Sequence, residues 1–330
     1  MAISVGLIGL KGHQGVILQG IEQLPDVRLA AVSDDDPAAL AGVPRWRASD
    51  ERTRCYTDWR EMLANETLDI AAECGADGAR AEVLIACARR GLDILCEKPL
   101  AMDLDQLAHL RRVVAETGVR LSMLLTMRFE PAYRAMREAI ARSAVGQVVL
   151  AAMQKSYRLG NRPQWQRDRR SFSGIIPYIG IHALDLIRWT TQREFVQAAA
   201  YQSNAAHPDL RDMEDNATIA LKLDNGGSAS ARLDYCRPAA APTHGDDRLR
   251  VAGSEGVIES LESGEQVTLI TQAEGPRQLP LAEPPQQFAD FVHDRETGEP
   301  CQVPADDCFR MTEICLKIRD VANTGRTVAL

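Results

Sequence analysis

The chain has 330 residues, of which 45% are hydrophobic and 25% are charged; this composition is typical of a folded globular protein and excludes a disordered or fibrous one. Its net charge of -8 at pH 7 argues against a large contact with nucleic acid or an anionic membrane. No apolar stretch approaches the roughly 20 residues of a membrane-spanning helix, and the apolar start at residues 3–10 lacks the basic flank of a signal peptide. The eight cysteines form no CxxC pair, so we expect reduced thiols and a cytoplasmic location.

The first 122 residues alternate short apolar segments with amphipathic ones. Residues 3–10 are typical of a central parallel strand, and apolar residues at helical spacing follow at 16–24. Further strands are predicted at 27–32, 68–72, 92–96 and 120–125, and further helices at 82–90 and 104–117. Strands and helices that alternate in this way form βαβ units, so residues 1–122 are predicted to be a doubly wound, parallel Rossmann domain.

The pattern changes after residue 128, where short strands and hairpin turns dominate. Helices are predicted at 131–142 and 181–190, and strands at 147–155, 196–202, 217–223, 227–236, 248–252, 256–260 and 266–270. The loop 238–247 is rich in alanine and proline and is expected to be mobile, and a final helix at 307–324 is able to pack back on the first domain. Turn signals at 224–227 and 253–256 predict an α+β domain over 123–330 with a large, mostly antiparallel open sheet.

The first chemical motif is the glycine-rich turn Gly9-Leu10-Lys11-Gly12-His13-Gln14-Gly15, which joins the first strand to the first helix. Glycine lets the backbone approach a pyrophosphate, which the amides and dipole of the helix N-terminus then hold. Lys11 occupies the second glycine position of the common G-x-G-x-x-G pattern. An ordinary tight turn is the alternative, but the succession of strand, turn, helix and acidic strand end favours a dinucleotide site.

That acidic strand end is Asp34, about 20 residues after the glycines, where a carboxylate accepts hydrogen bonds from the adenosine ribose hydroxyls. Asp35 and Asp36 add negative charge that would repel a 2′-phosphate, so NAD is favoured over NADP. NADP stays open, because Lys11 and Arg47 are both able to turn toward such a phosphate. The alternative is that the aspartates only form a turn before Pro37.

Two further motifs carry groups that can move protons. Lys98, in Glu97-Lys98-Pro99, follows the strand at 92–96 and is expected at the carboxyl edge of the sheet, where it can hydrogen-bond a substrate hydroxyl. The proline allows a cis peptide bond after the lysine. His182 opens a predicted helix and is a candidate general acid and base, with Asp185 one turn later able to orient it or cap the helix. Each residue alone has an ordinary structural explanation, and their combination favours catalysis.

These motifs, in this order, resemble the glucose-fructose oxidoreductase/inositol dehydrogenase/rhizopine catabolism (Gfo/Idh/MocA) family over nearly the whole chain. The resemblance is carried by residues 5–15, 31–37, 56–63, 91–100, 127–131, 174–185, 250–259 and 324–328. It implies a tightly held nicotinamide cofactor, a sugar, polyol or related substrate, and a second domain whose open sheet commonly joins subunits into a homodimer or homotetramer. Lys98 and His182 match the family's catalytic lysine and histidine.

The chain departs from the family pattern in three places. Tyr178 stands where an aspartate is usual, and a tyrosine with its ordinary pKa of about 10 can also relay a proton. Gly174 is all that remains of a triple glycine. The family's Pro-Asn-x-x-His after the third strand becomes Ala76-Asp77-Gly78-Ala79-Arg80, preceded by Glu73 and Cys74. These departures leave the fold prediction unchanged and bear on the net reaction.

The resemblance and the motifs together predict the site residues. Catalysis is expected from Lys98, His182 and Tyr178. Cofactor contacts are expected from Gly9, Lys11, Gly12, His13, Gln14, Asp34, Gly75, Glu97 and Lys98, and substrate contacts from Arg128, Trp165, Arg167 and Asp185. No metal is expected. The arginines between residues 158 and 170 would suit an anionic or hydroxyl-rich ligand, and a solvated loop or a subunit contact is the alternative.

The predicted function is an NAD(P)-dependent oxidoreductase that transfers hydride between nicotinamide and a hydroxyl-bearing carbon of a sugar, cyclitol or related small molecule. Two alternatives remain open. One is a lyase or glycosidase that oxidises its substrate transiently with bound NAD, and the other is a non-catalytic nucleotide-binding regulator. The expected partners are a sugar-like small molecule and further copies of the chain, with neither nucleic acid nor membrane.

Overall fold

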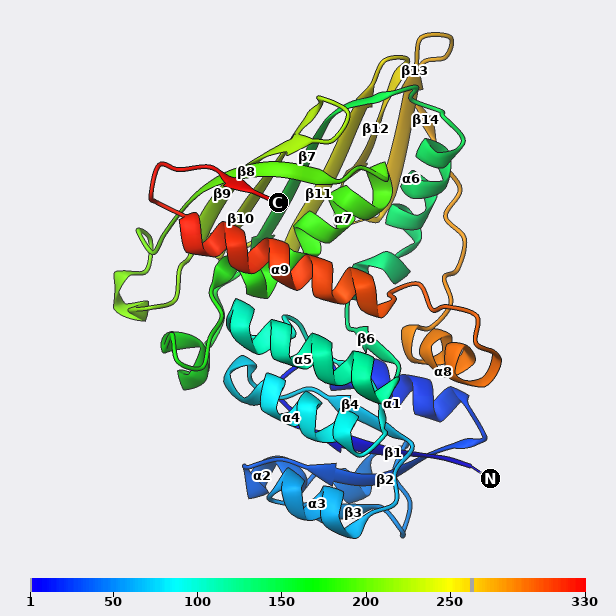
Figure 1. The fold of residues 1–330 in the computed structure, drawn as a ribbon. Helices are drawn as coiled ribbons and strands as arrows, with labels where there is room; N and C mark the ends of the chain where they lie inside the picture. The colour runs from blue at the N-terminus through cyan, green and yellow to red at the C-terminus, as the bar shows by residue number, and fades with distance from the viewer. Residues whose placement is uncertain (1, 262–263) are drawn as a thin grey trace. The chain divides into compact units, whose positions relative to one another are not determined.

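The computed structural model describes residues 2–261 and 264–330, which fold into two compact units (Figure 1). The first unit comprises the chain up to Leu124 together with Pro285–Thr312, and the second comprises Leu125–Pro284 together with Glu313–Leu330. This division runs close to the predicted limit at residue 122 but assigns Pro285–Thr312 to the first unit. Among the described residues, no helix is long and apolar enough to cross a membrane.

The first unit is built on a six-stranded parallel sheet in the order β3-β2-β1-β4-β5-β6. Its strands are β1 (Ile3–Ile8), β2 (Val27–Ser33), β3 (Arg54–Tyr56), β4 (Ile70–Glu73), β5 (Asp93–Cys96) and β6 (Leu121–Met123). The chain order reverses direction between β1 and β4, and open α/β sheets bind ligands beyond the carboxyl ends of the strands at such a reversal. The predicted doubly wound parallel sheet is confirmed.

Helices flank this sheet, and their ends follow from local sequence. They are α1 (Gln14–Gln23), α2 (Pro37–Leu40), α3 (Trp59–Asn65), α4 (Asp77–Arg89), α5 (Leu104–Thr117), α8 (Gln287–Thr297) and the first turns of α9 (Ala305–Val321), with a 3-10 turn at Val43–Arg45. The Asp103 carboxylate accepts the Gln106 amide at the start of α5, and Gly118 ends that helix with φ of 69°. A Cβ on Gly20 would lie 2.6 Å from Phe288 Cβ, so this glycine lets α1 approach α8 closely.

The second unit is built on a nine-stranded sheet in the order β14-β13-β12-β11-β7-β10-β9-β8-β15. Its strands are β7 (Val148–Tyr157), β8 (Phe195–Ser203), β9 (Asn216–Leu223), β10 (Ser228–Asp234), β11 (Gly245–Gly253), β12 (Gly256–Leu261), β13 (Gln266–Thr271), β14 (Arg277–Gln278) and β15 (Val328–Ala329). All neighbours pair antiparallel except β7 and β10. The predicted large, mostly antiparallel sheet is confirmed.

Helices α6 (Pro131–Ala141) and α7 (Ile181–Thr191) lie on one face of this sheet (Figure 1). Four short helical segments accompany them, at Thr126–Phe129, Gln164–Arg167, Ile176–Gly180 and Pro208–Leu210. Along β7 the side chains of Ala151 and Met153 are buried, whereas Leu150 is exposed. Successive side chains of a strand point to opposite faces, so the sheet has one packed face and one exposed face.

The structure differs from the predicted elements at several points. The segments β3, α3, α8, β14 and β15 were not predicted, and α4 begins at Asp77 rather than at residue 82. The predicted end of the loop 238–247 is also wrong, because β11 starts at Gly245, which pairs with Tyr157. Asp247 binds the buried ammonium of Lys155 at 2.7 Å. The polar residues at the end of the predicted loop are therefore part of the sheet.

Candidate functional site

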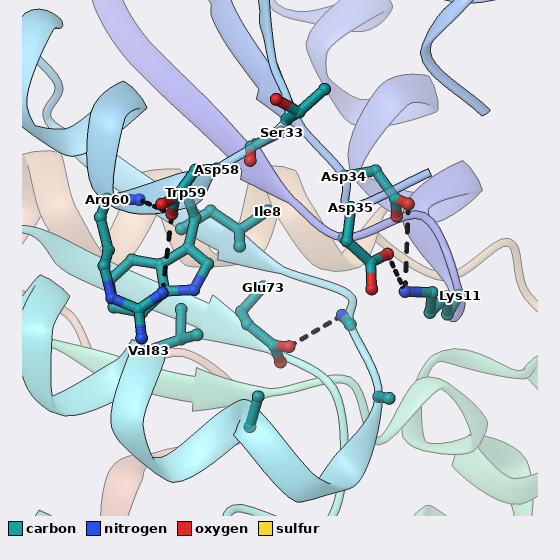
Figure 2. Close-up of a pocket in the computed structure, with 15 residues that line it drawn as sticks. Ile8, Lys11, Ser33, Asp34, Asp35, Asp58, Trp59, Arg60, Glu73 and Val83 are labelled. Carbon is teal, nitrogen blue, oxygen red and sulfur yellow. Dashed lines mark hydrogen bonds and ion pairs between the residues drawn. The ribbon is translucent and has the colours of Figure 1, made fainter. Parts of the chain in front are cut away.

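A cavity of about 340 Å³ opens at the carboxyl ends of β1, β2 and β4 in the first unit (Figure 2). It is lined by Ile8, Gly9, Lys11, Ser33, Asp34, Asp35, Thr57, Asp58, Trp59, Arg60, Glu73, Gly75, Ala76, Ala79 and Val83. Four of the residues predicted to contact a cofactor therefore lie together, namely Gly9, Lys11, Asp34 and Gly75. The cavity lies where the strand order reverses, which is where this kind of sheet binds dinucleotides.

The glycine turn has a shape that larger residues could not adopt. Gly9 has φ of +80°, and a Cβ there would lie 2.4 Å from Gly75 Cα. A Cβ on Gly12 would lie 2.4 Å from Glu97 Oε1. Helix α1 begins two residues later, with no acidic residue in its first turn and no side-chain cap. The bare backbone and the positive end of the α1 dipole fit the pyrophosphate of a dinucleotide.

The carboxylate of Asp34 is held by the backbone at the edge of the cavity. Asp34 is 4% exposed, and its two oxygens accept the Leu10 amide at 2.7 Å and the Asp36 amide at 2.9 Å. The Lys11 ammonium pairs with Asp35 and lies 3.9 Å from Asp34 Oδ1 (Figure 2). The hydrogen bond from Lys11 lowers the pKa of Asp35 below its usual value. Two carboxylates therefore share Lys11.

The opposite wall of the cavity contains an aromatic residue that sequence reasoning missed. The Arg60 guanidinium lies 4.2 Å from the centre of the Trp59 ring (Figure 2). It also pairs with Glu82 at 2.6 Å. The Asp58 carboxylate accepts the Arg60 amide at 2.8 Å and so starts α3. Asp58 followed by a helical segment could have predicted α3 from the sequence. The strand before it, β3, has three residues, which are too few to show a periodic pattern.

Glu97 joins the glycine turn to the predicted catalytic lysine. Glu97 is 2% exposed, and its Oε1 accepts the His13 amide at 2.5 Å and lies 2.5 Å from His13 Nδ1. Its Oε2 lies 3.8 Å from Lys98 Nζ, and the Lys98–Pro99 peptide bond is cis. Burial alone would raise the pKa of Glu97, but Lys98 and His13 outweigh it and hold that pKa well below its usual range. Glu97 is therefore an ionised partner for Lys98.

Arg80, in helix α4, is buried and bound on several sides. Its Nε donates to Glu73 Oε2 at 2.7 Å and its Nη1 to Asp77 Oδ1 at 3.1 Å. It also donates to the carbonyls of Pro99 and Gly75, each at 2.8 Å. Burial opposes the charge, but Glu73 and Asp77 raise the pKa of Arg80 above its usual value. One guanidinium thus ties the end of β4 to the peptide that follows the predicted catalytic lysine.

In the second unit, the structure brings Tyr178 and Trp165 together. Tyr178 lies in the helical segment before α7, with its ring centre 5.9 Å from that of Trp165 and 5.2 Å from that of Phe172. His182 lies in the first turn of α7 and is 5% exposed. A Cβ on Gly180 would lie 2.6 Å from Leu233 Cδ1, so this glycine lets the segment approach β10.

Two residues predicted to contact the substrate, Arg128 and Asp185, form a buried ion pair with each other. Arg128 Nε donates to Asp185 Oδ2 at 2.8 Å, and Arg128 Nη2 donates to Asp185 Oδ1 at 2.5 Å. Both side chains are 1% exposed. Parallel hydrogen bonds of this kind are strong and specific, so the pair braces the start of the second unit against α7. A substrate role for either residue stays a prediction.

Comparisons with known proteins agree with this geometry. The model of the oxidoreductase family NAD-binding Rossmann fold matches residues 3–125, and that of the GFO/IDH/MocA C-terminal domain matches residues 133–259. Inositol 2-dehydrogenase of Rhizobium meliloti is 27% identical over 259 residues, which are 78% of this chain and 75% of that protein. Myo-inositol 2-dehydrogenase of Thermotoga maritima is 26% identical over 281 residues, covering 83% and 79%. A solved structure described as a putative oxidoreductase from Thermotoga maritima is 30% identical, has a TM-score of 0.93 and covers 99% of this chain and 100% of that one.

Proposed function

Because the chain belongs to the Gfo/Idh/MocA family of NAD-binding oxidoreductases, we propose that it is an NAD-dependent dehydrogenase that acts on a hydroxyl-bearing carbon of a sugar or cyclitol. The observation that carries this proposal is Lys98, which is buried at the carboxyl end of β5 with ionised Glu97 beside it. Glu97 in turn binds the glycine turn through His13. The names of the inositol dehydrogenase relatives support a cyclitol or sugar as substrate.

A bound nicotinamide would accept or supply the hydride. The Lys98 ammonium, which Glu97 favours in its charged form, would donate a hydrogen bond to the reacting substrate oxygen and stabilise negative charge on it. When a hydroxyl is oxidised its proton must leave, and the imidazole of His182 is the group suited to accept it near neutral pH. Tyr178, in the segment that leads into α7, would pass the proton onward in place of the usual aspartate.

We infer a preference for NAD over NADP from the charges around Asp34. The Asp34 carboxylate follows β2 directly, with Asp35 beside it, and both would repel a 2′-phosphate. Lys11 is the cation nearest to this position on the glycine turn, but it is already shared between the two carboxylates. This pairing weakens the case for NADP.

Replacing Lys98 with methionine tests the proposed chemistry. Lys98→Met keeps an unbranched side chain of nearly the same length and removes the charge, so turnover should fall by about 10²- to 10⁴-fold while NAD binding remains measurable. Nicotinamide absorbance with myo-inositol and a panel of sugars reports turnover, and calorimetry reports binding. Lys222→Met, exposed on β9, is the matched control. Full activity of the Lys98 variant would contradict the role assigned to Lys98 in turnover.

The replacement of the usual aspartate by Tyr178 keeps the non-catalytic alternative open. The transient-oxidation alternative predicts that bound NAD is reduced and then re-oxidised within one turnover. Product formation without a net change in nicotinamide absorbance would support it, and net consumption of NADH would exclude it. The non-catalytic alternative is disfavoured because both Lys98 and His182 are retained.

A further inference from the structure

The segment that follows β7 carries more positive charge than the acids around it neutralise. Residues 158–170 contain five arginines and one aspartate, although the chain as a whole is acidic. Two of these arginines have carboxylate partners: Arg169 pairs with Glu214, and Arg170 pairs with Asp168 at 2.5 Å. These two charges are neutralised locally.

The other three, Arg158, Arg162 and Arg167, have no carboxylate within 4.0 Å among the described residues. Arg158 Nη2 donates to the Ala241 carbonyl, Arg162 Nη2 donates to the Arg158 carbonyl at 3.2 Å, and the Arg162 guanidinium lies 4.2 Å from the centre of the Tyr235 ring. Backbone and aromatic contacts thus hold Arg158 and Arg162 in place without neutralising them.

Each of the three guanidinium groups also has an unused donor. The Nε atoms of Arg158, Arg162 and Arg167 are shielded from solvent and have no hydrogen-bond partner within the described part of the chain. Leaving a buried donor without an acceptor destabilises a protein, and more so when the donor is charged. The described part of the chain therefore offers no acceptor to these three donors.

Asp246 and Asp247, at this end of the sheet, are already bound to other cations. The ends of β7 and β10 meet the start of β11 here, where Tyr157 pairs with Gly245. Asp247 Oδ2 accepts from Lys155 Nζ at 2.7 Å, and Asp246 Oδ1 accepts from Arg248 Nε at 2.8 Å. Neither aspartate neutralises the three arginines.

Arg158 and Arg162 also affect the pKa of His244, which lies next to these strand ends. Burial lowers its pKa first, and Arg162 and Arg158 lower it further by repulsion. Its ring stacks on Tyr157 with 5.2 Å between the ring centres. Two guanidinium groups therefore act on one location at the strand ends.

The arginine segment also contacts a predicted catalytic residue of the same unit. Trp165, between Arg162 and Arg167 in the chain, packs edge-on against Tyr178. An anionic group bound by these arginines would thus be held by the segment that packs on Tyr178.

We propose that Arg158, Arg162 and Arg167 form a subsite for an anionic group, so that the substrate is a sugar bearing a carboxylate or a phosphate. Assigning this subsite to a substrate rests on the proposed dehydrogenase function. A guanidinium presents paired donors that match the oxygens of either anion. The uncharged inositols named for the relatives would leave these donors unused.

The test uses sugars that differ mainly in charge. D-glucose, D-glucuronate and D-glucose 6-phosphate differ at C6, and D-gluconate places the charge at C1. Binding to the NAD-loaded protein is measured by calorimetry, and turnover by nicotinamide absorbance. We expect at least one charged sugar to bind about tenfold or more tightly than D-glucose, and the carboxylate and phosphate arms identify which anion is preferred.

Variants separate the subsite from general folding. Arg162→Gln should weaken binding of the preferred anion by about tenfold and change D-glucose binding less than twofold. Arg162→Lys should keep part of the affinity because it keeps the charge. Arg170→Gln, exposed and paired only with Asp168, is the matched control and should bind as the parent does, with melting temperatures compared throughout.

Three results are decisive. Tighter binding of a charged sugar that Arg162→Gln abolishes supports the subsite. The same binding without turnover also supports it, and contradicts only the dehydrogenase proposal for that sugar. Equal or tighter binding of D-glucose, or no binding of any charged sugar, overturns the subsite.

Discussion

At the scale of single residues, we expect the carboxylate of Asp34 to favour NAD over NADP. Asp34→Asn keeps an acceptor for the Leu10 or Asp36 amide and removes the negative charge. Lys11, now paired only with Asp35, becomes freer to meet a 2′-phosphate. We expect kcat/KM for NAD to fall by about tenfold and the NADP/NAD ratio to rise by about 10²-fold, since each tenfold change corresponds to about 1.4 kcal/mol.

Steady-state kinetics with both cofactors check this prediction. Asp35→Asn is the matched comparison, because the Asp35 side chain is 78% exposed and its charge is more strongly screened by solvent. It should move the ratio less than Asp34→Asn does. An unchanged cofactor ratio in the Asp34 variant would remove Asp34 as the discriminating residue.

The places of single residues in the fold were predictable where they lie at a characteristic distance from a motif or a strand. Asp34 follows the glycines at a set distance, and Lys98 follows a strand. The Arg128–Asp185 pair was not predictable as a pair, because its members are 57 residues apart and only folding brings them together. Trp59 and Arg60 were missed because nothing in their local pattern marks the wall of a cavity.

At the scale of elements, Arg80 joins the end of β4 to the turn after β5. Arg80→Met would leave Glu73 buried without its countercharge, and breaking a buried pair typically lowers the free energy of unfolding by about 3–5 kcal/mol. The carbonyls of Gly75 and Pro99 would also lose their donor. We expect kcat to fall by about 10- to 100-fold, because the direction of Lys98 depends on the peptide that Arg80 holds.

A second variant distinguishes positioning of Lys98 from support of the fold. Glu73→Gln combined with Arg80→Met removes both charges of this pair, although Asp77 also loses Arg80, so part of the lost stability should return. If Arg80 positions Lys98, kcat stays low in this double variant while KM for NAD changes little. Recovery of kcat together with the melting temperature would show that Arg80 serves the fold alone. Arg89→Met, exposed on the same helix, is the control.

Helices and strands were predictable where their apolar residues are periodic and where capping or turn residues mark their ends. Helix α5 has the predicted limits because Asp103 and Gly118 mark its ends, and the hairpin turns separate β9 from β10 and β11 from β12 as expected. Helix α8 was missed, although Phe288 and Phe291 are buried in the first unit. It lies far along the chain from the other elements of that unit, so no local pattern relates it to them.

At the scale of the whole molecule, the exposed face of the nine-stranded sheet carries an apolar row. Leu150 pairs with Ala252, Ala252 with Val257, and Val257 with Ile270. Directly paired residues of neighbouring strands point to the same face, and Leu150 and Ile270 are 41% and 37% exposed. A contiguous exposed apolar patch is typical of an interaction surface, and we propose that this row joins copies of the chain into a homodimer or homotetramer.

Charge placed on this row tests the assembly. The parent protein should elute with two or four times the mass of one chain in size-exclusion chromatography with light scattering. Leu150→Lys combined with Ile270→Lys should shift it to one chain mass, because two interfaces of the same kind would then meet with like charges that must be desolvated. Leu281→Lys changes an equally exposed leucine (38%) that lies outside the sheet and should leave the mass unchanged. A monomeric parent, or a double variant that still assembles, would exclude this face as the contact between subunits.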